Sequence, residues 1–314
     1  MTIRCAVIGV GYLGKFHAQK YAALDGAELV AVVDPNTEAT AALAAELGCR
    51  HHRSHQEILD QVDAVSIVAP TTLHHAIASD CLSRGIHVLL EKPITTTVAE
   101  ADELIALARA HGAVLQVGHL ERFNPAIMAL GERLGDQVRF IESHRLAPFK
   151  PRATDVSVML DLMIHDIDII LHLVKSEITE IRASGAAVLS DSVDIANARL
   201  AFANGCIANV TASRISQKSE RKMRLFQHNQ YLNVDFQQKR LDVYSRGDGE
   251  MYPGVPEIVH EFEQGGEADA LMLEIEDFLG AITGGRAPVV TGEDGRRALE
   301  MAIRIGGLLK EQQL

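Results

Sequence analysis

The chain has 314 residues and a formal net charge of −12, with 30 basic and 42 acidic residues. This acidic surplus argues against a nucleic-acid or anionic-membrane partner, and the length exceeds that of one average domain. No apolar run is long enough to cross a bilayer, and the start, MTIRCAVIGV, lacks the layout of a signal peptide, so we expect a cytoplasmic protein.

The first 120 residues alternate short apolar runs with helical stretches. The predicted strands are Ile3–Ile8, Glu28–Val33, Ala64–Val68, Ile86–Leu90 and Ala113–Val117. The predicted helices are Leu13–Leu24, Thr37–Leu47, Leu73–Ser83 and Thr97–His111. Strands that alternate with helices of this length indicate parallel βαβ units, so residues 1–120 are predicted to form an α/β Rossmann domain with a doubly wound parallel sheet.

After about residue 120 the pattern changes to successive strands. They are predicted at Val138–Leu146, Ile178–Leu189, Val193–Ala203, Cys206–Ser213, Arg221–Gln227, Tyr231–Phe236 and Arg240–Tyr244. Asn204-Gly205 is a strong hairpin signal between two of them. Residues 121–314 are therefore predicted to form a second, α+β domain with an antiparallel sheet.

The end of the chain contains one predicted loop and two predicted helices. The stretch Arg246–Ala268 is rich in glycine and acids, and we interpret it as a surface loop. Leu271–Ile282 and Gly292–Leu309 have apolar residues at helical spacing. The last helix is a candidate for packing back on the first domain.

A glycine-rich turn follows the first strand and opens the first helix. Gly9 allows the tight turn, Gly11 lets the backbone approach a pyrophosphate, and Gly14 permits close packing of helix on strand. Tyr12 and Leu13 lie between them at the helix amino end, where free N–H groups and the helix dipole favour phosphate. We therefore predict that this turn binds a dinucleotide.

Asp34 ends the second predicted strand, about twenty residues after Gly14. A carboxylate at this position bonds an adenine ribose in Rossmann domains and repels a 2′-phosphate. No lysine or arginine lies between Pro35 and Cys49 to offset that charge, so the sequence predicts NAD over NADP. The alternative is an aspartate that caps the following helix.

Lys92 stands at the carboxyl end of a predicted buried strand, within Glu91-Lys92-Pro93. In an open α/β sheet, ligands bind at this rim. Lys92 is therefore a candidate base or hydrogen-bond donor for a reacting hydroxyl, against the alternative of an ordinary surface lysine. Pro93 restricts the turn, with a cis or a trans bond before it.

His74 and His75 follow the third predicted strand. One of them is a candidate to line the pocket at the rim of the sheet, beside Lys92.

Val158–Val174 is apolar on nearly all sides, which predicts a buried helix. Its Asp161, His165, Asp168 and His172 fall within a sector of about 60° on a regular helix. Because charged groups are costly in an apolar core, they must face a cleft, water or one another. His165 has the surroundings of an acid/base; a metal site and a polar contact between domains are the alternatives. No third metal ligand is evident, so we predict no metal.

The motifs GVGYLG, AVVDP, APTTLH, EKP and Asp161-x-x-x-His165 together resemble the Gfo/Idh/MocA family of sugar and cyclitol oxidoreductases. The resemblance spans nearly the whole chain. It implies a Rossmann domain followed by a large open antiparallel sheet that often forms dimers or tetramers. It further implies that Lys92 and His165 are the catalytic pair and that Asp161 lines the substrate pocket.

The resemblance also extends to the cofactor contacts. APTTLH resembles the family's Thr-Pro-x-x-x-His, which places Pro70 and His74, with Glu91 and Lys92, at the cofactor. Ala69 stands where the family usually has threonine, and this departure concerns one cofactor contact.

Within the family, Gly118–Ala126 and Leu160–Ile170 are most similar to a branch that oxidises the C3 hydroxyl of UDP-N-acetylglucosamine for lipid A or surface glycans. The alternatives are an inositol or simple-sugar dehydrogenase and, in another class, a non-catalytic NAD-sensing protein.

Charge supports a nucleotide-sugar substrate. His144, Arg145, Lys150 and Arg152 crowd the predicted loop before the polar helix, and arginine suits bidentate contact with a pyrophosphate. We therefore predict that Arg145, Lys150 and Arg152 bind the substrate. A second basic set, Arg214–Arg224, flanks a predicted hairpin, where a solvated or subunit-facing sheet edge explains it equally well.

Overall fold

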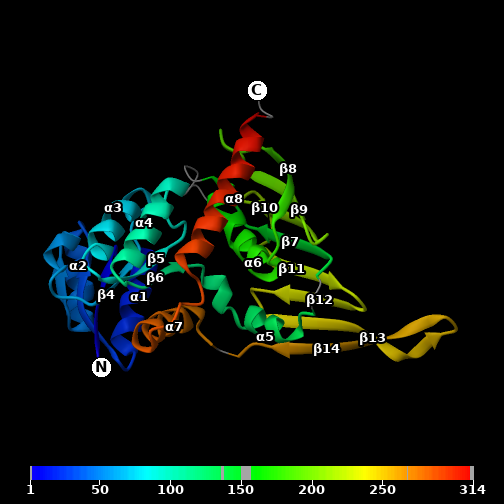
Figure 1. The fold of residues 1–314 in the computed structure, drawn as a ribbon, viewed down its shortest axis with the longest axis horizontal. Helices are drawn as coiled ribbons and strands as arrows, with labels where there is room; N and C mark the ends of the chain where they lie inside the picture. The colour runs from blue at the N-terminus through cyan, green and yellow to red at the C-terminus, as the bar shows by residue number, and fades with distance from the viewer. Residues whose placement is uncertain (1, 136–137, 150–156, 267, 312–314) are drawn as a thin grey trace. The chain divides into compact units, whose positions relative to one another are not determined.

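The computed structural model describes residues 2–135, 138–149, 157–266 and 268–311. The chain divides into two compact units (Figure 1). The first unit comprises Met1–Leu120 and Asp269–Leu299, and the second comprises Glu121–Ala268 and Glu300–Leu314.

The first unit is built on a parallel sheet with the order β3-β2-β1-β4-β5-β6. Its strands are β1 (Ile3–Ile8), β2 (Ala27–Val33), β3 (Arg50–His52), β4 (Ala64–Ile67), β5 (His87–Glu91) and β6 (Leu115–Gly118). Its connecting helices are α1 (Tyr12–Ala23), α2 (Thr37–Leu47), α3 (Thr71–Leu82) and α4 (Val98–Ala110). The predicted doubly wound Rossmann fold is confirmed.

Two elements of this unit differ from the sequence-based expectation. The edge strand β3 covers Arg50–His52, a polar segment outside the predicted strands, because three residues are too few to show a strand pattern. Helix α7 (Ala270–Gly284), from the far end of the chain, also belongs here. Its Ile275 and Phe278 join Tyr21 of α1 and Leu89 of β5 in one buried apolar cluster.

The second unit contains an eight-stranded sheet with the order β14-β13-β12-β11-β7-β10-β9-β8 in the described part of the chain. Its strands are β7 (Phe140–Leu146), β8 (Ile178–Ala186), β9 (Ile195–Phe202), β10 (Ile207–Ser213), β11 (Glu220–Gln227), β12 (Gln230–Asp235), β13 (Arg240–Tyr252) and β14 (Val255–Gln264). Neighbouring strands run antiparallel except β7 and β10, which are parallel, so the sheet is mixed. The α+β expectation is confirmed, with this one pairing as a correction.

The helical segments of the second unit include α5 (Pro125–Arg133), a π-helical turn at Met159–Met163 and α6 (Ile164–Val174). The last helix, α8 (Gly292–Glu311), contributes its residues from Glu300 onward to this unit. No helix in the described ranges combines the length and the apolar character needed to span a bilayer.

The predicted loop Arg246–Ala268 is wrong, because β13 and β14 form a long hairpin there (Figure 1). Gly254 makes the turn with a φ of 77°, a value that favours glycine. Irregular pairing between Arg246 and Tyr252 accommodates the glycines that had suggested a loop. Large apolar side chains such as Phe262, 59% exposed, remain on the hairpin surface.

Candidate active site

The glycine turn between β1 and α1 has the backbone geometry that a pyrophosphate site requires. Gly9 has a φ of 90°, and a Cβ added to Gly14 would lie 1.8 Å from the Gly9 carbonyl oxygen, so both positions require glycine. A Cβ on Gly11 would meet no atom within 4 Å, so the backbone there is open to a ligand. Gly11 is also the N-cap of α1 and supplies no side-chain cap, which leaves the first N–H groups of the helix available to an anion.

Asp34 lies directly after β2, beside this turn. Its carboxylate accepts hydrogen bonds from the backbone N–H of Val10, at 3.0 Å, and of Asn36, at 2.9 Å. The cap of α2 is the Asn36 side chain, which accepts from the Ala39 N–H, so the alternative of Asp34 as the N-cap does not hold. These bonds fix the carboxylate next to the glycine turn, where a ribose hydroxyl would reach its remaining lone pairs.

Lys92 follows β5 at the carboxyl rim of the parallel sheet and is followed by a cis peptide bond to Pro93. Its backbone N–H donates to the carboxylate of Glu91 at 3.2 Å. The other carboxylate oxygen of Glu91 lies 3.2 Å from Nε2 of His17, a fully buried residue of α1 that sequence reasoning missed. The spacing of His17 from the glycine turn, three residues after Gly14, was the available signal.

His74 supports the Lys92-Pro93 turn from the protein interior and does not line an open pocket. It is fully buried, and its two ring nitrogens lie 2.9 Å from the carbonyl oxygens of Pro93 and Ala69. Burial lowers the pKa of His74, and its bonds to these carbonyls oppose that shift. His74 therefore links the segment after β4 to the Lys92-Pro93 turn, while His75 lies near the surface and pairs with Glu103.

Asp161 and His165 lie in the second unit, where a π-helical turn runs directly into α6. Asp161 is within the π turn and His165 is the second residue of α6, and both are partly exposed. A π turn holds more residues than a regular turn, so the sector predicted for Asp161 on a regular helix does not apply. Such turns occur frequently at functional sites.

The other acids of this helix are neutralised by buried arginines. Asp168 accepts two hydrogen bonds from Arg122, at 2.6 and 2.8 Å, and both side chains are about 2% exposed. Asp166 accepts from Arg145 at 2.7 Å. Asp166 therefore links α6 to β7, and Asp168 links α6 to the Leu120–Phe123 turn. The arginines compensate the charges that the two buried carboxylates bring out of water.

Arg145 is not accessible to a substrate in the way that the charge pattern suggested. Together with His144 it belongs to β7, within the predicted strand Val138–Leu146, and it is 3% exposed. Besides Asp166 it donates to Glu121 at 2.9 Å, and its guanidinium lies over the ring of Phe236. All three nitrogens are bonded within the unit, so Arg145 is a structural residue here and the prediction of substrate contact is corrected. Lys150 and Arg152 lie outside the described residues.

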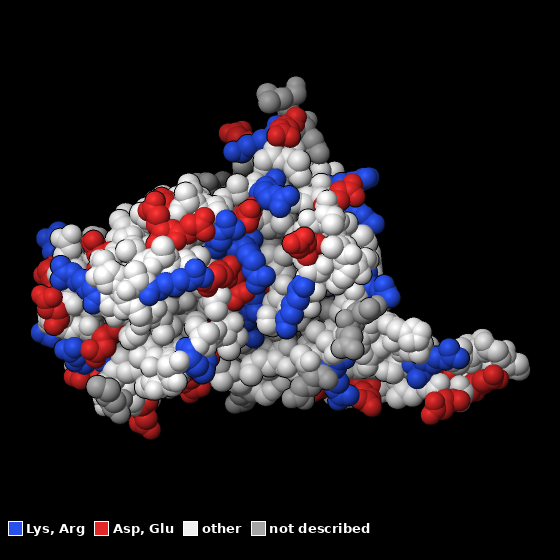
Figure 2. All heavy atoms as spheres, in the orientation of Figure 1, with Lys and Arg blue, Asp and Glu red and all other residues white. Residues whose placement is uncertain are grey.

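Two members of the second basic set are also paired with acids. Arg224 donates to Glu142 at 2.9 Å, and Lys222 lies 3.4 Å from Asp235. Both belong to β11, which pairs with β12 and β7 inside the sheet, so the interpretation as a sheet edge is wrong. Figure 2 shows the same mixture over the visible surface, where basic and acidic side chains are interspersed.

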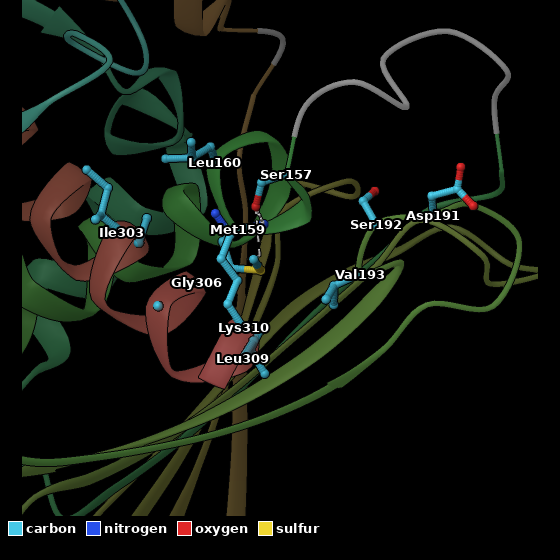
Figure 3. A pocket seen from close by; sticks show the side chains of 12 residues that line it. Ser157, Met159, Leu160, Asp191, Ser192, Val193, Ile303, Gly306, Leu309 and Lys310 are labelled. Atoms are coloured by element: carbon cyan, nitrogen blue, oxygen red, sulfur yellow. Dashed lines mark hydrogen bonds between the residues drawn. The ribbon is translucent and has the colours of Figure 1, made fainter. Parts of the chain in front are cut away.

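A cavity of about 430 Å³ opens in the second unit, near the π turn (Figure 3). Its lining comes from the start of the π turn, the β8–β9 loop and the end of α8, and includes Met159, Leu160, Val193, Ile303 and Lys310. Ser157 accepts from the Met159 N–H at 3.2 Å at its rim. Asp161 and His165 are not among the described residues that line it, so it is separate from the predicted catalytic groups.

Comparison with known proteins gives matches over both units. Residues 3–119 match the oxidoreductase family with an NAD-binding Rossmann fold, and residues 133–233 match the GFO/IDH/MocA C-terminal domain. The UDP-N-acetylglucosamine 3-dehydrogenase of Acidithiobacillus ferrooxidans is 45% identical over 303 residues, which is 96% of each chain. A solved structure of that enzyme aligns with a TM-score of 0.94 at 44% identity, covering 99% of this chain and 98% of the other.

More distant relatives share the architecture. The scyllo-inositol 2-dehydrogenase (NAD(+)) of Bacillus subtilis is 27% identical over 96% of this chain and 92% of its own. Levoglucosan dehydrogenase in complex with NADH aligns with a TM-score of 0.88 at 19% identity, covering 99% of this chain and 98% of the other, which shows a common fold.

Proposed function

This chain belongs to the Gfo/Idh/MocA family of NAD-binding oxidoreductases, and from that premise we propose that it oxidises the C3 hydroxyl of UDP-N-acetylglucosamine to the 3-keto nucleotide sugar. The observation that carries the proposal is the 45% identity to an enzyme of that name over nearly the full length of both chains. Three relatives named for inositol substrates that match over at least 92% of both chains share 27% identity or less.

In this proposal the first unit holds the cofactor and one proton-handling group. NAD supplies the hydride acceptor. The backbone of Gly9–Gly14 receives the pyrophosphate at the start of α1, and the Asp34 carboxylate receives the ribose hydroxyls. Lys92 stands at the carboxyl rim of the sheet, where it hydrogen-bonds the reacting hydroxyl.

The second unit supplies the remaining groups. His165 shares with Lys92 the proton that leaves the C3 hydroxyl, and Asp161 orients the ring hydroxyls or the imidazole. Asp161 lies in the π turn, before the regular helix that holds Asp166 and Asp168. Arg122 and Arg145 keep α6 in place through Asp168 and Asp166 and do not contact the sugar.

We propose further that the product feeds amino-sugar synthesis for lipid A or surface glycans, in the cytoplasm, and that the chain forms a homodimer or homotetramer through the sheet of the second unit. The long β13–β14 hairpin with exposed apolar side chains supports an interface there. The mass in solution, measured by light scattering, tests the oligomer.

The substrate is tested by incubating the protein with NAD and a panel of candidates, and following the absorbance of the reduced cofactor. The panel contains UDP-N-acetylglucosamine, UDP-glucose, free N-acetylglucosamine, myo-inositol and scyllo-inositol, with hydroxylamine present to trap a ketone. We expect the highest kcat/KM with UDP-N-acetylglucosamine, and mass spectrometry should find the oxime of its 3-keto form.

Two other outcomes would replace this assignment. Faster turnover of an inositol or a free sugar would favour the simple-polyol activity that the 27% identical relative suggests. NAD binding without reduction by any substrate in the panel would favour a non-catalytic NAD-sensing protein.

A further inference from the structure

Three ionisable side chains meet inside the first unit, next to the Glu91-Lys92 turn. His17 comes from α1, Glu91 from the end of β5 and Glu274 from α7, and one ring nitrogen or carboxylate oxygen from each lies within 4.8 Å of the other two. His17 and Glu274 are fully buried, and the Glu91 side chain is 12% exposed. The predicted cofactor and proton-handling groups do not account for Glu274.

The hydrogen bonds of this cluster can be assigned from donor to acceptor along one chain of residues. The hydroxyl of Tyr21 lies 2.9 Å from that of Ser66, which lies 3.3 Å from Nδ1 of His17. Since Nε2 of His17 lies 3.2 Å from a carboxylate, we assign its proton to Nε2, and Nδ1 accepts from Ser66. The chain of donors therefore ends on Glu91, which also accepts from the Lys92 N–H.

Glu274 is the unexplained member of the cluster. Both of its carboxylate oxygens are buried without a hydrogen-bond partner, although one of them lies within 4.8 Å of an oxygen of the Glu91 carboxylate. Two ionised carboxylates so close together and out of water would repel each other and lack solvation. One proton between them removes the repulsion and gives Glu274 a donor to place on Glu91.

The surroundings of Glu274 support a bound proton. Burial raises the pKa of Glu274 well above its usual value, and the charges of Glu91 and Asp277 raise it further. Asp277 is itself held by Arg286 at 2.6 Å. In the described ranges, the ionisable groups near the two carboxylates include His17 and Tyr21 from α1, His74 from α3 and Asp277 from α7.

The neighbouring strand leaves room for the Glu91 carboxylate. Gly118 of β6 pairs with Glu91 across the sheet, and a Cβ added to Gly118 would lie 3.0 Å from the carboxyl carbon of Glu91. Any larger residue at position 118 would therefore displace this carboxylate.

We infer that Glu274 carries a proton that it shares with Glu91, so that the cluster bears one negative charge beside Lys92, with Glu274 and His17 as positioning residues for the Glu91-Lys92 turn. The inference of a shared proton depends on the geometry of the first unit alone. Its consequence for catalysis rests on the proposed function, in which Lys92 handles the proton of the substrate.

The pH dependence of thermal stability tests the shared proton without any substrate. In the unfolded chain Glu274 ionises near its ordinary pKa of 4.5, while in the folded chain it keeps its proton to a higher pH. The folded state therefore binds more protons, and the wild-type chain loses stability as pH rises from about 4.5 through the raised pKa. Glu274→Gln removes this loss because the amide does not titrate.

We expect the melting temperature of Glu274→Gln, relative to the wild type, to rise by roughly 5 °C or more between about pH 5 and pH 9. Glu276→Gln is the matched control, because Glu276 lies on the exposed side of the same helix. Its melting curve should follow the wild type at every pH. A constant difference between Glu274→Gln and the wild type across this range would overturn the shared proton.

Enzyme activity distinguishes a positioning role of Glu274 from a role in packing alone. Glu274→Gln can still donate an N–H to Glu91, so its kcat and pH profile should stay within about twofold of the wild type. Glu274→Leu fills similar volume without a donor, and we expect at least a tenfold lower kcat with a displaced pH profile and an unchanged KM. Equal pH profiles for Glu274→Leu and the wild type would overturn the positioning role.

Two further measurements complete the test. One equivalent of zinc or another divalent metal in the purified wild type, lost in Glu274→Gln, would overturn the shared proton in favour of a metal site, since the same three residues could serve as ligands. Full activity of Lys92→Ala would refute the proposed role of Lys92, and the pH dependence of melting would still decide whether Glu274 holds a proton.

Discussion

The glycine turn of the first unit and the polar helix of the second unit both present partners for charge, but with different groups. The turn offers backbone N–H groups between Gly9 and Gly14, all from six consecutive residues. The helix uses carboxylates whose arginine partners lie 21 and 46 positions away along the chain. A backbone site can therefore be recognised locally, whereas a charged side chain has no assignable role until its partner is known.

The largest effect on catalysis is expected for Lys92 and His165, the two groups that the proposed reaction takes from the two units. Lys92→Ala and His165→Ala should each lower kcat by roughly 10²–10⁴-fold, the range for loss of an acid/base group. If the two act as a pair, the double variant should be little worse than the poorer single variant. Steady-state kinetics measure this, with NAD binding and circular dichroism as controls. Near-normal turnover of either single variant would place the chemistry elsewhere.

Breaking the buried Arg122–Asp168 pair of the second unit should lower the free energy of unfolding rather than the catalytic rate. Arg122→Met leaves Asp168 buried without its guanidinium, and we expect a loss of about 3–5 kcal/mol in the free energy of unfolding. The control is Arg182→Gln, whose pair with Glu180 is largely exposed and should contribute less than about 1 kcal/mol. Urea unfolding measures both.

The double variant Arg122→Met/Asp168→Leu sharpens this prediction. It removes both charges, so much of the lost stability should return. A double variant as unstable as the single one would show that shape, not charge, governs this position.

In the first unit, two glycine variants should separate folding from binding. Gly14→Ala should destabilise the unit by roughly 3 kcal/mol, because the added carbon has no room next to the Gly9 carbonyl. Gly11→Ala should change stability by no more than about 0.5 kcal/mol, because no atom lies nearby. Its NAD affinity should nevertheless fall at least tenfold, measured by fluorescence titration; unchanged affinity would exclude Gly11 from the pyrophosphate site.

The variant Asp194→Asn tests how much one carboxylate contributes to the stability of a turn in the second unit. Burial by itself would raise the pKa of Asp194, but N–H donors from Leu189, Val188 and Ser190 and the Ser190 hydroxyl bring the pKa down to about 2. Its stabilisation is thus present above about pH 4 and lost as pH falls toward 2. Asp194→Asn should cost about 1–2 kcal/mol at neutral pH and flatten acid unfolding in that window.

The smallest effect is expected for cofactor choice. Asp34→Asn removes the charge that would repel a 2′-phosphate, so the preference for NAD over NADP should fall roughly tenfold. Dissociation constants for both cofactors measure this. An unchanged ratio would mean that Asp34 serves only to bind the Val10 and Asn36 N–H groups.

Sequence patterns predicted much of the fold and part of the candidate site. The alternation of apolar runs and helices gave the order of the Rossmann elements, because each βαβ unit is local in sequence. The same local reasoning failed for Arg246–Ala268, where glycines interrupt a long hairpin. It placed Arg145 in a strand correctly but missed its burial, because its two carboxylate partners are distant in the sequence.

By itself, the sequence determined the elements and the glycine turn, since these depend on neighbouring residues and on backbone conformation. Only the tertiary structure decided which charges meet. It paired Asp168 with Arg122 and brought His17, Glu91 and Glu274 together from three elements that are up to 257 positions apart. The physical reason is that the cost of a buried charge depends on atoms within a few ångströms, and in a folded chain those atoms come from anywhere in the sequence.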